Sequence, residues 1–498
     1  MSLRIALLVT ALALPVGAAF AEPSDSATTQ ALERELISDR AVPFDDIDIS
    51  TSEGIVTLTG SVDNLLARER AVRIAETVKG VRAVLNRIQV EAAEDRSDDE
   101  IRADIHHAFL VDPATDDYEV KVSVNGGRVT LAGTVDSWHE QRLAERVAKG
   151  VRGVTDLQND IVVELAQVRP DGEIQREIEQ ALRWDARVDD ALVEVSAEGG
   201  LVRVKGTVGS AAEKRIVRTM AWTAGVNAVD DSQLKVELWA RNPDLRGEKY
   251  VLKSPEELEG ALQAALAQDP RVQPFDVEID AEGDGTVTLR GHVDNVKALR
   301  VAEQVARHTV GVHRVVNHLR VQPEEVPDAE ILMAVREAIR RDAFLAGQDI
   351  AVRVRGGVVH MSGVVDSLFE KGEADDVASR VKGVKRIANR LVVRDLPYAY
   401  SPYVDDWTLC SCDWYDLGHE PIRTLRSDAE LRDAIRSELR WSPFVTSEQV
   451  TIEVSDGVAT LTGTVDSWPE RLAARENALD AGATYVRNEL DVKSASAP

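Results

Sequence analysis

The sequence predicts an α+β protein built from six tandem copies of one α-β-β-α-β module. The main observation is a phrase of two glycines, alternating apolar residues and Val-Asp, first seen as Gly54-Ile-Val-Thr-Leu-Thr-Gly60-Ser-Val-Asp63. The second glycine of the phrase returns at 60, 133, 206, 291, 363 and 463, in steps of 73, 73, 85, 72 and 100 residues. Such a period, with a linker and an insert in the two longer steps, is typical of tandem duplication.

The elements of one module follow from its periodicity. A first helix, as in Ile101–Phe109, has apolar residues every three or four positions. An alternating strand and a glycine turn then lead into the glycine phrase, which is the second strand of a hairpin. A second helix begins at a Ser or Asn cap, as in Ser137-Trp-His-Glu140, and a third strand closes the module. Because strand-helix-strand crossovers are right-handed, we expect a small three-stranded mixed sheet with two helices on one face.

The second glycine of the phrase shares a face of its strand with buried apolar residues, such as Val56 and Leu58 beside Gly60. This position predicts that a helix packs closely on the sheet where no Cβ is in the way. A β-bulge is the alternative. The glycines are therefore interpreted as structural: Gly60, Gly133, Gly206, Gly291, Gly363 and Gly463.

The element order divides the chain into modules with separate cores. A signal peptide is predicted at 1–21, a linker at 239–253 and an insert rich in aromatic residues and cysteine at 395–426. Modules 1 to 6 are predicted at 27–92, 98–165, 171–238, 254–322, 328–394 and 427–493.

The N-terminus has the order of a secretory signal. Arg4 precedes the apolar run Ile5–Val16, and Ala19-Phe20-Ala21 is a small-x-small cleavage site. An uncleaved membrane anchor is the alternative, but Pro15 and Gly17 favour cleavage. We therefore expect a soluble, exported mature chain; its location in the periplasm of a Gram-negative bacterium is implied by the family resemblance given below.

The net charge of the chain disfavours two kinds of partner contact. Asp and Glu number 86 against 59 Lys and Arg, a formal charge of -27, which argues against nucleic acid and against a polybasic grip on anionic lipid. Arg68, Arg70 and Arg73 form a local basic group, but Glu69 and Glu76 share their helix, so a solvated mixed face is predicted.

The combined motifs resemble the BON domain, which occurs in OsmY-like periplasmic proteins. The resemblance rests on the hairpin phrase, the Ser-capped helix and a closing Gly-Val-x-x-Val-x-Asn-x-Leu-x-Val, as far as Val90 in module 1. The third copy departs from it, with Gly209 in place of the Asp and Asp231 in place of the closing Asn. The resemblance implies envelope or osmotic-stress protection, peripheral binding to phospholipid or the membrane surface, no enzymatic activity and no cofactor.

Tryptophans are candidate contacts with lipid or a partner, because an indole ring is amphipathic. Trp138 and Trp468 begin second helices, and Trp184 and Trp441 close first helices. The alternative is that each packs within its own module.

The insert is a candidate partner surface, because aromatic residues are enriched at protein interfaces. Cys410 and Cys412 could form a strained disulfide. With His419 they offer zinc-type ligands, but no second ligand pair is recognisable, so no metal is predicted. Intermolecular disulfides or plain packing remain open. The aromatic residues are Tyr398, Tyr400, Tyr403, Trp407, Trp414 and Tyr415.

No catalytic motif is recognisable: the chain has no G-x-S-x-G elbow, phosphate loop or H-E-x-x-H helix. Two functions remain. The first is envelope protection through many weak lipid contacts, which add by effective concentration. The second is a protein-interaction scaffold that docks a partner through the insert; a ligand or cation sensor is a weaker third. The sequence leaves the oligomeric state open.

Overall fold

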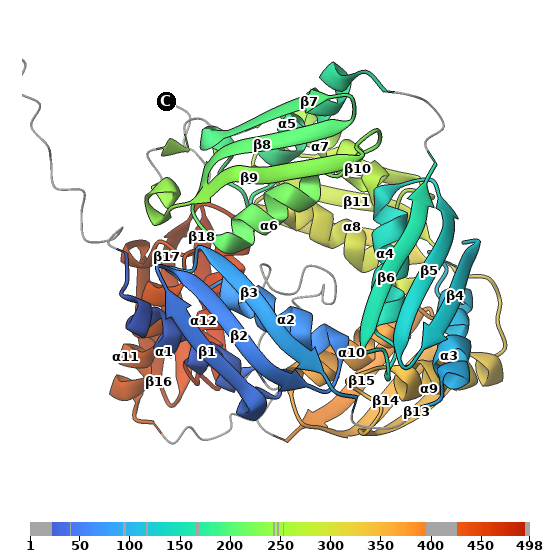
Figure 1. The fold of residues 1–498 in the computed structure, drawn as a ribbon. Helices are drawn as coiled ribbons and strands as arrows, with labels where there is room; N and C mark the ends of the chain where they lie inside the picture. Colours follow the sequence, from blue (N-terminus) through green and yellow to red (C-terminus); the bar gives the residue numbers. More distant parts are fainter. Residues whose placement is uncertain are drawn as a thin grey trace, which may run out of the picture.

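The computed structural model describes residues 22–39, 41–92, 96–115, 118–164, 169–242, 245–246, 249–251, 253–394 and 426–493. The predicted signal peptide and nearly all of the insert lie outside the described residues. The described chain contains the predicted module six times, each with its own three-stranded sheet. The sheets form the outside of the molecule and the second helices point to its middle (Figure 1).

Module 1 shows the common plan. Helix α1 (Asp25–Ser38) is followed by strands β1 (Ile47–Ser52) and β2 (Ile55–Val62), helix α2 (Leu65–Glu76) and strand β3 (Ala83–Val90). Strand β2 lies in the centre of the sheet, antiparallel to β1 and parallel to β3. Both helices pack on the sheet and against each other. The predicted fold class and element order are confirmed.

The other modules repeat this order. Their first and second helices are α3 (Asp98–Val111) and α4 (Trp138–Lys149), α5 (Asp171–Trp184) and α6 (Ala211–Met220), α7 (Pro255–Gln268) and α8 (Val296–His308), α9 (Asp328–Arg341) and α10 (Leu368–Ser379), and α11 (Asp428–Trp441) and α12 (Trp468–Asp480). Their strands are β4 (Val120–Asn125), β5 (Arg128–Val135), β6 (Asp156–Val163), β7 (Val193–Glu198), β8 (Leu201–Val208), β9 (Ala228–Val236), β10 (Val277–Ala281), β11 (Thr286–Val293), β12 (Arg314–Val321), β13 (Asp349–Arg355), β14 (Val358–Val365), β15 (Arg386–Val393), β16 (Val450–Ser455), β17 (Val458–Val465) and β18 (Tyr485–Val492).

Side-chain caps fix where the helices begin. Asn64 Oδ1 accepts a hydrogen bond from the Ala67 amide at 2.7 Å, and Ser137 Oγ accepts one from the Glu140 amide at 3.2 Å. A second contact at the helix start was not predicted from the sequence. The Asp98 carboxylate accepts hydrogen bonds from the amides of Gly126 and Gly127 and so connects the first helix to the hairpin turn. These two bonds lower the pKa of Asp98. Asp25, Asp171, Asp328 and Asp428 make the equivalent contact.

The second glycine of the phrase is required for a reason other than the predicted one. Gly206 has φ of +122°, and a Cβ there would overlap the carbonyl oxygen of Leu192, just before the paired strand β7. The same holds for Gly60 and the carbonyl oxygen of Asp46. The expectation of a helix lying over this glycine is therefore wrong. The close approach is between two backbones in one hairpin.

The first residue of the second helix connects neighbouring modules. Leu65 of module 1 is buried in the core of module 2, and Ala211 of module 3 in the core of module 1. Trp138 of module 2 donates its indole N–H to the Val226 carbonyl of module 3 at 2.9 Å. These contacts close modules 1, 2 and 3 into a ring.

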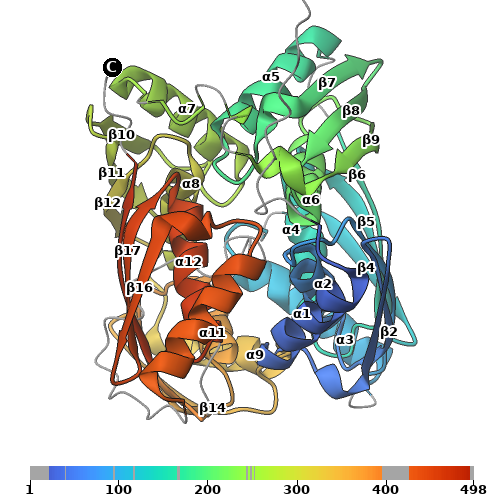
Figure 2. The same ribbon diagram turned by 90° about the vertical axis from the view of Figure 1, so that its left-hand side faces the viewer.

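The same position joins modules 4, 5 and 6. Val296 of module 4 lies in the core of module 5, and Trp468 of module 6 donates its indole N–H to His313 O of module 4 at 2.6 Å. The view in Figure 2, turned by 90° from Figure 1, shows α11, α12, α1 and α2 between the sheet of module 6 on one side and that of module 1 on the other.

Backbone hydrogen bonds at helix ends join the two groups of three. Arg152 N donates to Arg341 O at 2.8 Å, between modules 2 and 5. Ala186 N donates to His308 O at 2.8 Å, between modules 3 and 4, and Lys79 N donates to Trp441 O at 3.3 Å, between modules 1 and 6. The first module thus pairs with the last, the second with the fifth and the third with the fourth.

The cores of the modules are distinct, with one correction to the prediction. Modules 1, 2, 4 and 5 each have their own cluster of buried apolar side chains. Those of modules 3 and 6 form one continuous cluster. Arg241, just after module 3, lies over the Phe444 ring of module 6 at 5.6 Å, because these two modules pack directly against each other.

We expect Gly206→Ala to lower the free energy of unfolding by about 2–4 kcal/mol, since it adds strain at a positive φ to overlap with a backbone carbonyl. Gly172→Ala is the matched control, because a Cβ there meets nothing within 4 Å and lies in a helix. Urea unfolding followed by circular dichroism measures both. Equal stability of the two variants would contradict this account.

Candidate functional site

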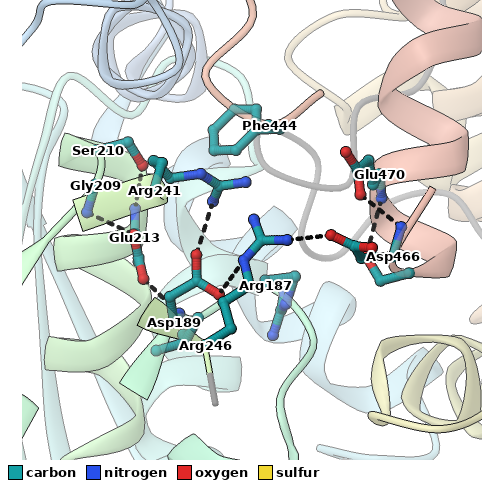
Figure 3. A network of polar contacts seen from close by, with 12 residues as sticks. Arg187, Asp189, Gly209, Ser210, Glu213, Arg241, Arg246, Phe444, Asp466 and Glu470 are labelled. Carbon is teal, nitrogen blue, oxygen red and sulfur yellow. Dashed lines mark hydrogen bonds and ion pairs between the residues drawn. The ribbon is translucent and has the colours of Figure 1, made fainter. Parts of the chain in front are cut away.

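The predicted linker between modules 3 and 4 has two buried basic side chains, Arg246 and Lys249, in its described part. Arg246 pairs with Asp189 of module 3 at 3.1 Å and also with Asp466 of module 6 (Figure 3). The Lys249 ammonium donates to the Leu182 carbonyl at 2.9 Å and to the Asp190 carboxylate at 2.8 Å. Breaking a buried pair leaves an uncompensated charge, so this part of the linker holds modules 3 and 6 together.

A buried carboxyl group completes the network in Figure 3. Glu213 accepts hydrogen bonds from the amides of Asp189 at 2.5 Å and Gly209 at 2.8 Å. Burial, together with the charge of Asp189, raises the pKa of Glu213 to about 7. Gly209 is the residue by which the third copy departs from the repeat, and a Cβ there would overlap the side chain of Arg241. We interpret this network as structural.

The four candidate tryptophans all lie at contacts between modules. Trp138 lies 4.5 Å from the Trp222 ring of module 3, and the guanidinium of Arg307 from module 4 lies 5.4 Å from the Trp468 ring. Trp184 packs against the core of module 4 and Trp441 against that of module 1. Packing within their own module therefore does not account for all the contacts of these four side chains, because each also contacts a neighbouring module. Their contact with lipid stays a prediction.

The insert candidates cannot be placed. Both cysteines and the six aromatic residues of the insert lie outside the described residues, so the expectations of a disulfide and of a partner surface stay predictions. Among the described residues, no group of three or more His, Cys, Asp or Glu side chains is arranged to hold a metal ion.

A cavity of about 890 Å³, partly open to solvent, lies between modules 1, 2, 3 and 4. Residues of the second helices α2, α4, α6 and α8 line it, together with residues of α5 and α7. The four second helices carry twelve Lys or Arg and six Asp or Glu residues, in a chain whose net charge is -27. The cavity lining nevertheless combines these basic residues with carboxylates of the same and of other helices, such as Glu69, Glu145 and Glu177.

The arginines of α2 show the inward orientation. Arg70 is 2% exposed, pairs with Asp39 at 2.8 Å and lies 4.3 Å from the Phe369 ring of module 5. Arg68 and Arg73 line the large cavity. The predicted solvated face is therefore wrong for Arg70, which Asp39 of its own module and Phe369 of module 5 cover, whereas Arg73 stays 24% exposed beside Glu69.

A smaller cavity of about 110 Å³ adjoins the large one, and residues of the acidic helix α10 of module 5 form part of its lining. Lys297 of module 4 pairs with Asp376 of α10 at 2.6 Å, and burial lowers the pKa of Lys297 to about 8. Burial, with Asp342 and Asp376 nearby, raises the pKa of Glu373 to about 8. Acidic side chains of α10 thus meet basic side chains of the other modules.

Glu373 predicts a pH dependence of stability. The ordinary pKa of this carboxyl is 4.5. Between about pH 4.5 and 8 the folded chain therefore still holds a proton that the unfolded chain has already released. The stability of the natural protein should therefore fall as pH rises through this window. Glu373→Gln lacks this loss, so we expect it to be more stable by about 1–3 kcal/mol at pH 8.5 and similar to the natural protein at pH 4.5.

Urea unfolding at a series of pH values measures this difference. The exposed Glu330, on helix α9 of the same module, gives the control variant Glu330→Gln. If both variants follow the natural protein at every pH, Glu373 is not protonated in the fold.

Comparison with known proteins assigns the chain to a family. The BON domain model matches residues 24–92, 97–164, 170–237, 254–323, 327–395 and 427–494. Osmotically-inducible protein Y of Escherichia coli is 34% identical over 143 residues, 28% of this chain and 71% of the relative. The outer membrane lipoprotein DolP of Haemophilus influenzae is 30% identical over 157 residues, 26% of this chain and 81% of the relative.

Among solved structures, the type III secretion protein CdsD of Chlamydia trachomatis matches at 14% identity over 41% of this chain and 91% of that chain. The TM-score of this match is 0.12, which is too low to support an assignment. The assignment rests instead on the six matched segments, each of which contains one complete α-β-β-α-β module. The chain belongs to the BON domain family.

Proposed function

We propose that this protein is a non-enzymatic component of the cell envelope, located in the periplasm, which binds phospholipid at the membrane surface and protects against osmotic or envelope stress. The observation that carries the proposal is that six BON modules make up the described chain. The relative named as an outer membrane lipoprotein supports the envelope location, and the relative named as an osmotically inducible protein supports a role in osmotic stress.

The outer sheets are the surfaces available for peripheral contact, because the candidate tryptophans are engaged between modules. Val162 of β6 and Val392 of β15 occupy the same position in modules 2 and 5 and are 57% and 62% exposed. Repeated weak contacts of this kind add through effective concentration. No helix among the described residues is long and apolar enough to cross a bilayer.

Vesicle co-sedimentation of the mature chain tests the proposal. We expect sedimentation with phospholipid vesicles at low salt and two- to tenfold weaker binding for Val162→Ser combined with Val392→Ser. Both side chains are exposed, so the fold should tolerate these changes.

The control for this experiment is Val122→Ser combined with Val352→Ser. These valines are buried in the same two modules, so their replacement should lower stability without removing an outer contact. Absence of sedimentation with both anionic and zwitterionic vesicles at low salt would contradict the proposal.

The alternative is a protein-interaction scaffold that docks a partner through residues 395–426. One observation favours it: six of the 22 aromatic residues in the chain lie in these 32 residues. Replacing the six by Ser should abolish capture of an envelope protein in a pull-down, while Trp239→Ser, on an indole that is 46% exposed elsewhere, should not. Unchanged partners would count against the scaffold.

A further inference from the structure

The outer sheet of module 5 carries a charge of the opposite sign to the chain as a whole. Its outward positions in β13, β14 and β15 alternate with positions that face the helices, and they lie on the outside of the molecule (Figure 1). Four of these outward residues are arginines and one is an aspartate, in a chain whose net charge is -27. The charged residues of this face are Arg353, Arg355, Arg386, Arg390 and Asp349.

Strand pairing brings the four arginines together. The central strand β14 is antiparallel to β13 and parallel to β15, so Val358 lies between Arg355 on one side and Arg386 on the other. Arg353 is two residues from Arg355 along β13, and Arg390 is four residues from Arg386 along β15. Since strands lie about 5 Å apart and two residues advance about 7 Å, the Cα atoms of the four span a patch about 10 Å wide and about 14 Å long.

Carboxylates of the protein leave this patch positive. All four arginines are exposed, and none of them pairs with a carboxylate in the described part of the chain. Asp349 lies at the far end of the face, opposite Val364. Asp328, at the hairpin turn, is already bound by two backbone amides and lies near Lys385. The charge of the arginines is therefore available to a partner.

Other sheets of the same fold balance their basic side chains. In module 3, Arg203 pairs with Glu198 of the neighbouring strand at 3.0 Å. Arg355 takes the place of Glu198 in module 5, since each ends its strand opposite the first residue of the next. At the outward positions of module 6 acidic residues outnumber basic ones, with Glu453, Glu489 and Asp491 against Arg487. The basic face is therefore a property of module 5 and not of the repeat.

Exposed apolar side chains complete the face. Val364 and Val392 lie opposite each other in β14 and β15 and are 39% and 62% exposed. Guanidinium groups bind phosphate oxygens in pairs of parallel hydrogen bonds, and exposed apolar side chains favour the boundary between headgroups and acyl chains. An acidic protein segment would match the arginines alone. The combination with the valine pair favours a lipid surface.

We propose that the protein docks on membranes that contain anionic phospholipid through the outer sheet of module 5. This inference rests on the membrane-surface function proposed above and adds the class of lipid and the face that meets it. Because the chain is strongly acidic as a whole, an anionic bilayer repels its other surfaces, so this face sets the orientation of the molecule. The residues on the headgroup phosphates are Arg353, Arg355, Arg386 and Arg390.

Co-sedimentation of the full mature chain with two kinds of vesicle at low salt tests the face. One kind is phosphatidylcholine alone, and the other is phosphatidylcholine mixed with phosphatidylglycerol. We expect the natural protein to bind the mixed vesicles at least fivefold more tightly. Arg353→Gln combined with Arg390→Gln should weaken this binding about tenfold or more, since each basic side chain near an anionic surface contributes a factor of about five. Binding to phosphatidylcholine alone should not change.

Arg87→Gln combined with Arg487→Gln is the matched control. Both arginines are exposed at outward positions of β3 and β18, so this variant loses the same charge from the sheets of modules 1 and 6. Arg87 also has the same position in module 1 that Arg390 has in module 5. Since all four side chains are exposed, both double variants should fold, and circular dichroism checks this.

The possible outcomes separate this face from the membrane function itself. Equal weakening by the two double variants would overturn the face, because binding would then follow net charge alone. If the module 5 variant binds mixed vesicles as the natural protein does, the arginines serve another partner, such as an acidic protein segment, and the proposal fails. Equal binding of the natural protein to both kinds of vesicle also overturns it but leaves the membrane function standing. Absence of sedimentation with either kind overturns both.

Discussion

The arrangement of the molecule depends on one small contact: the first residue of a second helix inserts into the neighbouring module. Leu65, Trp138 and Ala211 make this contact around the first three modules, and Val296 and Trp468 make it in the other three. Because the contact lies at the start of the helix, it orients the rest of that helix toward the middle. The charged side chains of the second helices must then find partners inside, as Lys149 does with Glu69.

The module could be predicted from the sequence because its signals are local. Glycine spacing, strand alternation and caps such as Ser137 act within a few residues, and the structure confirms the fold they indicate. The arrangement of modules and the central cavity could not be predicted in this way. A polar face such as that of Arg70 and Arg73 has the same pattern whether it meets water or a carboxylate of another segment, as Arg70 meets Asp39.

Departures from the repeat carry information about contacts between modules. Gly209 replaces the repeated Asp where Arg241 crosses the end of β8, and any larger side chain would collide with it. The acidic composition of α10 is similar: Asp376 and Glu373 lie where Lys297 and Arg380 supply positive charge. A residue that breaks the repeat in one copy therefore indicates a place where that copy meets something the others do not.

The pairing of the first module with the last has a consequence for biosynthesis. Lys79 finds the Trp441 carbonyl only after almost the whole polypeptide exists. Of the three pairs that join the two groups, modules 3 and 4 are neighbours along the chain and can form theirs first, whereas module 1, beside modules 2 and 3, keeps one flank uncovered until module 6 exists. Chain order thus sets a schedule in which assembly closes from the centre outward and the N-terminal end is completed last.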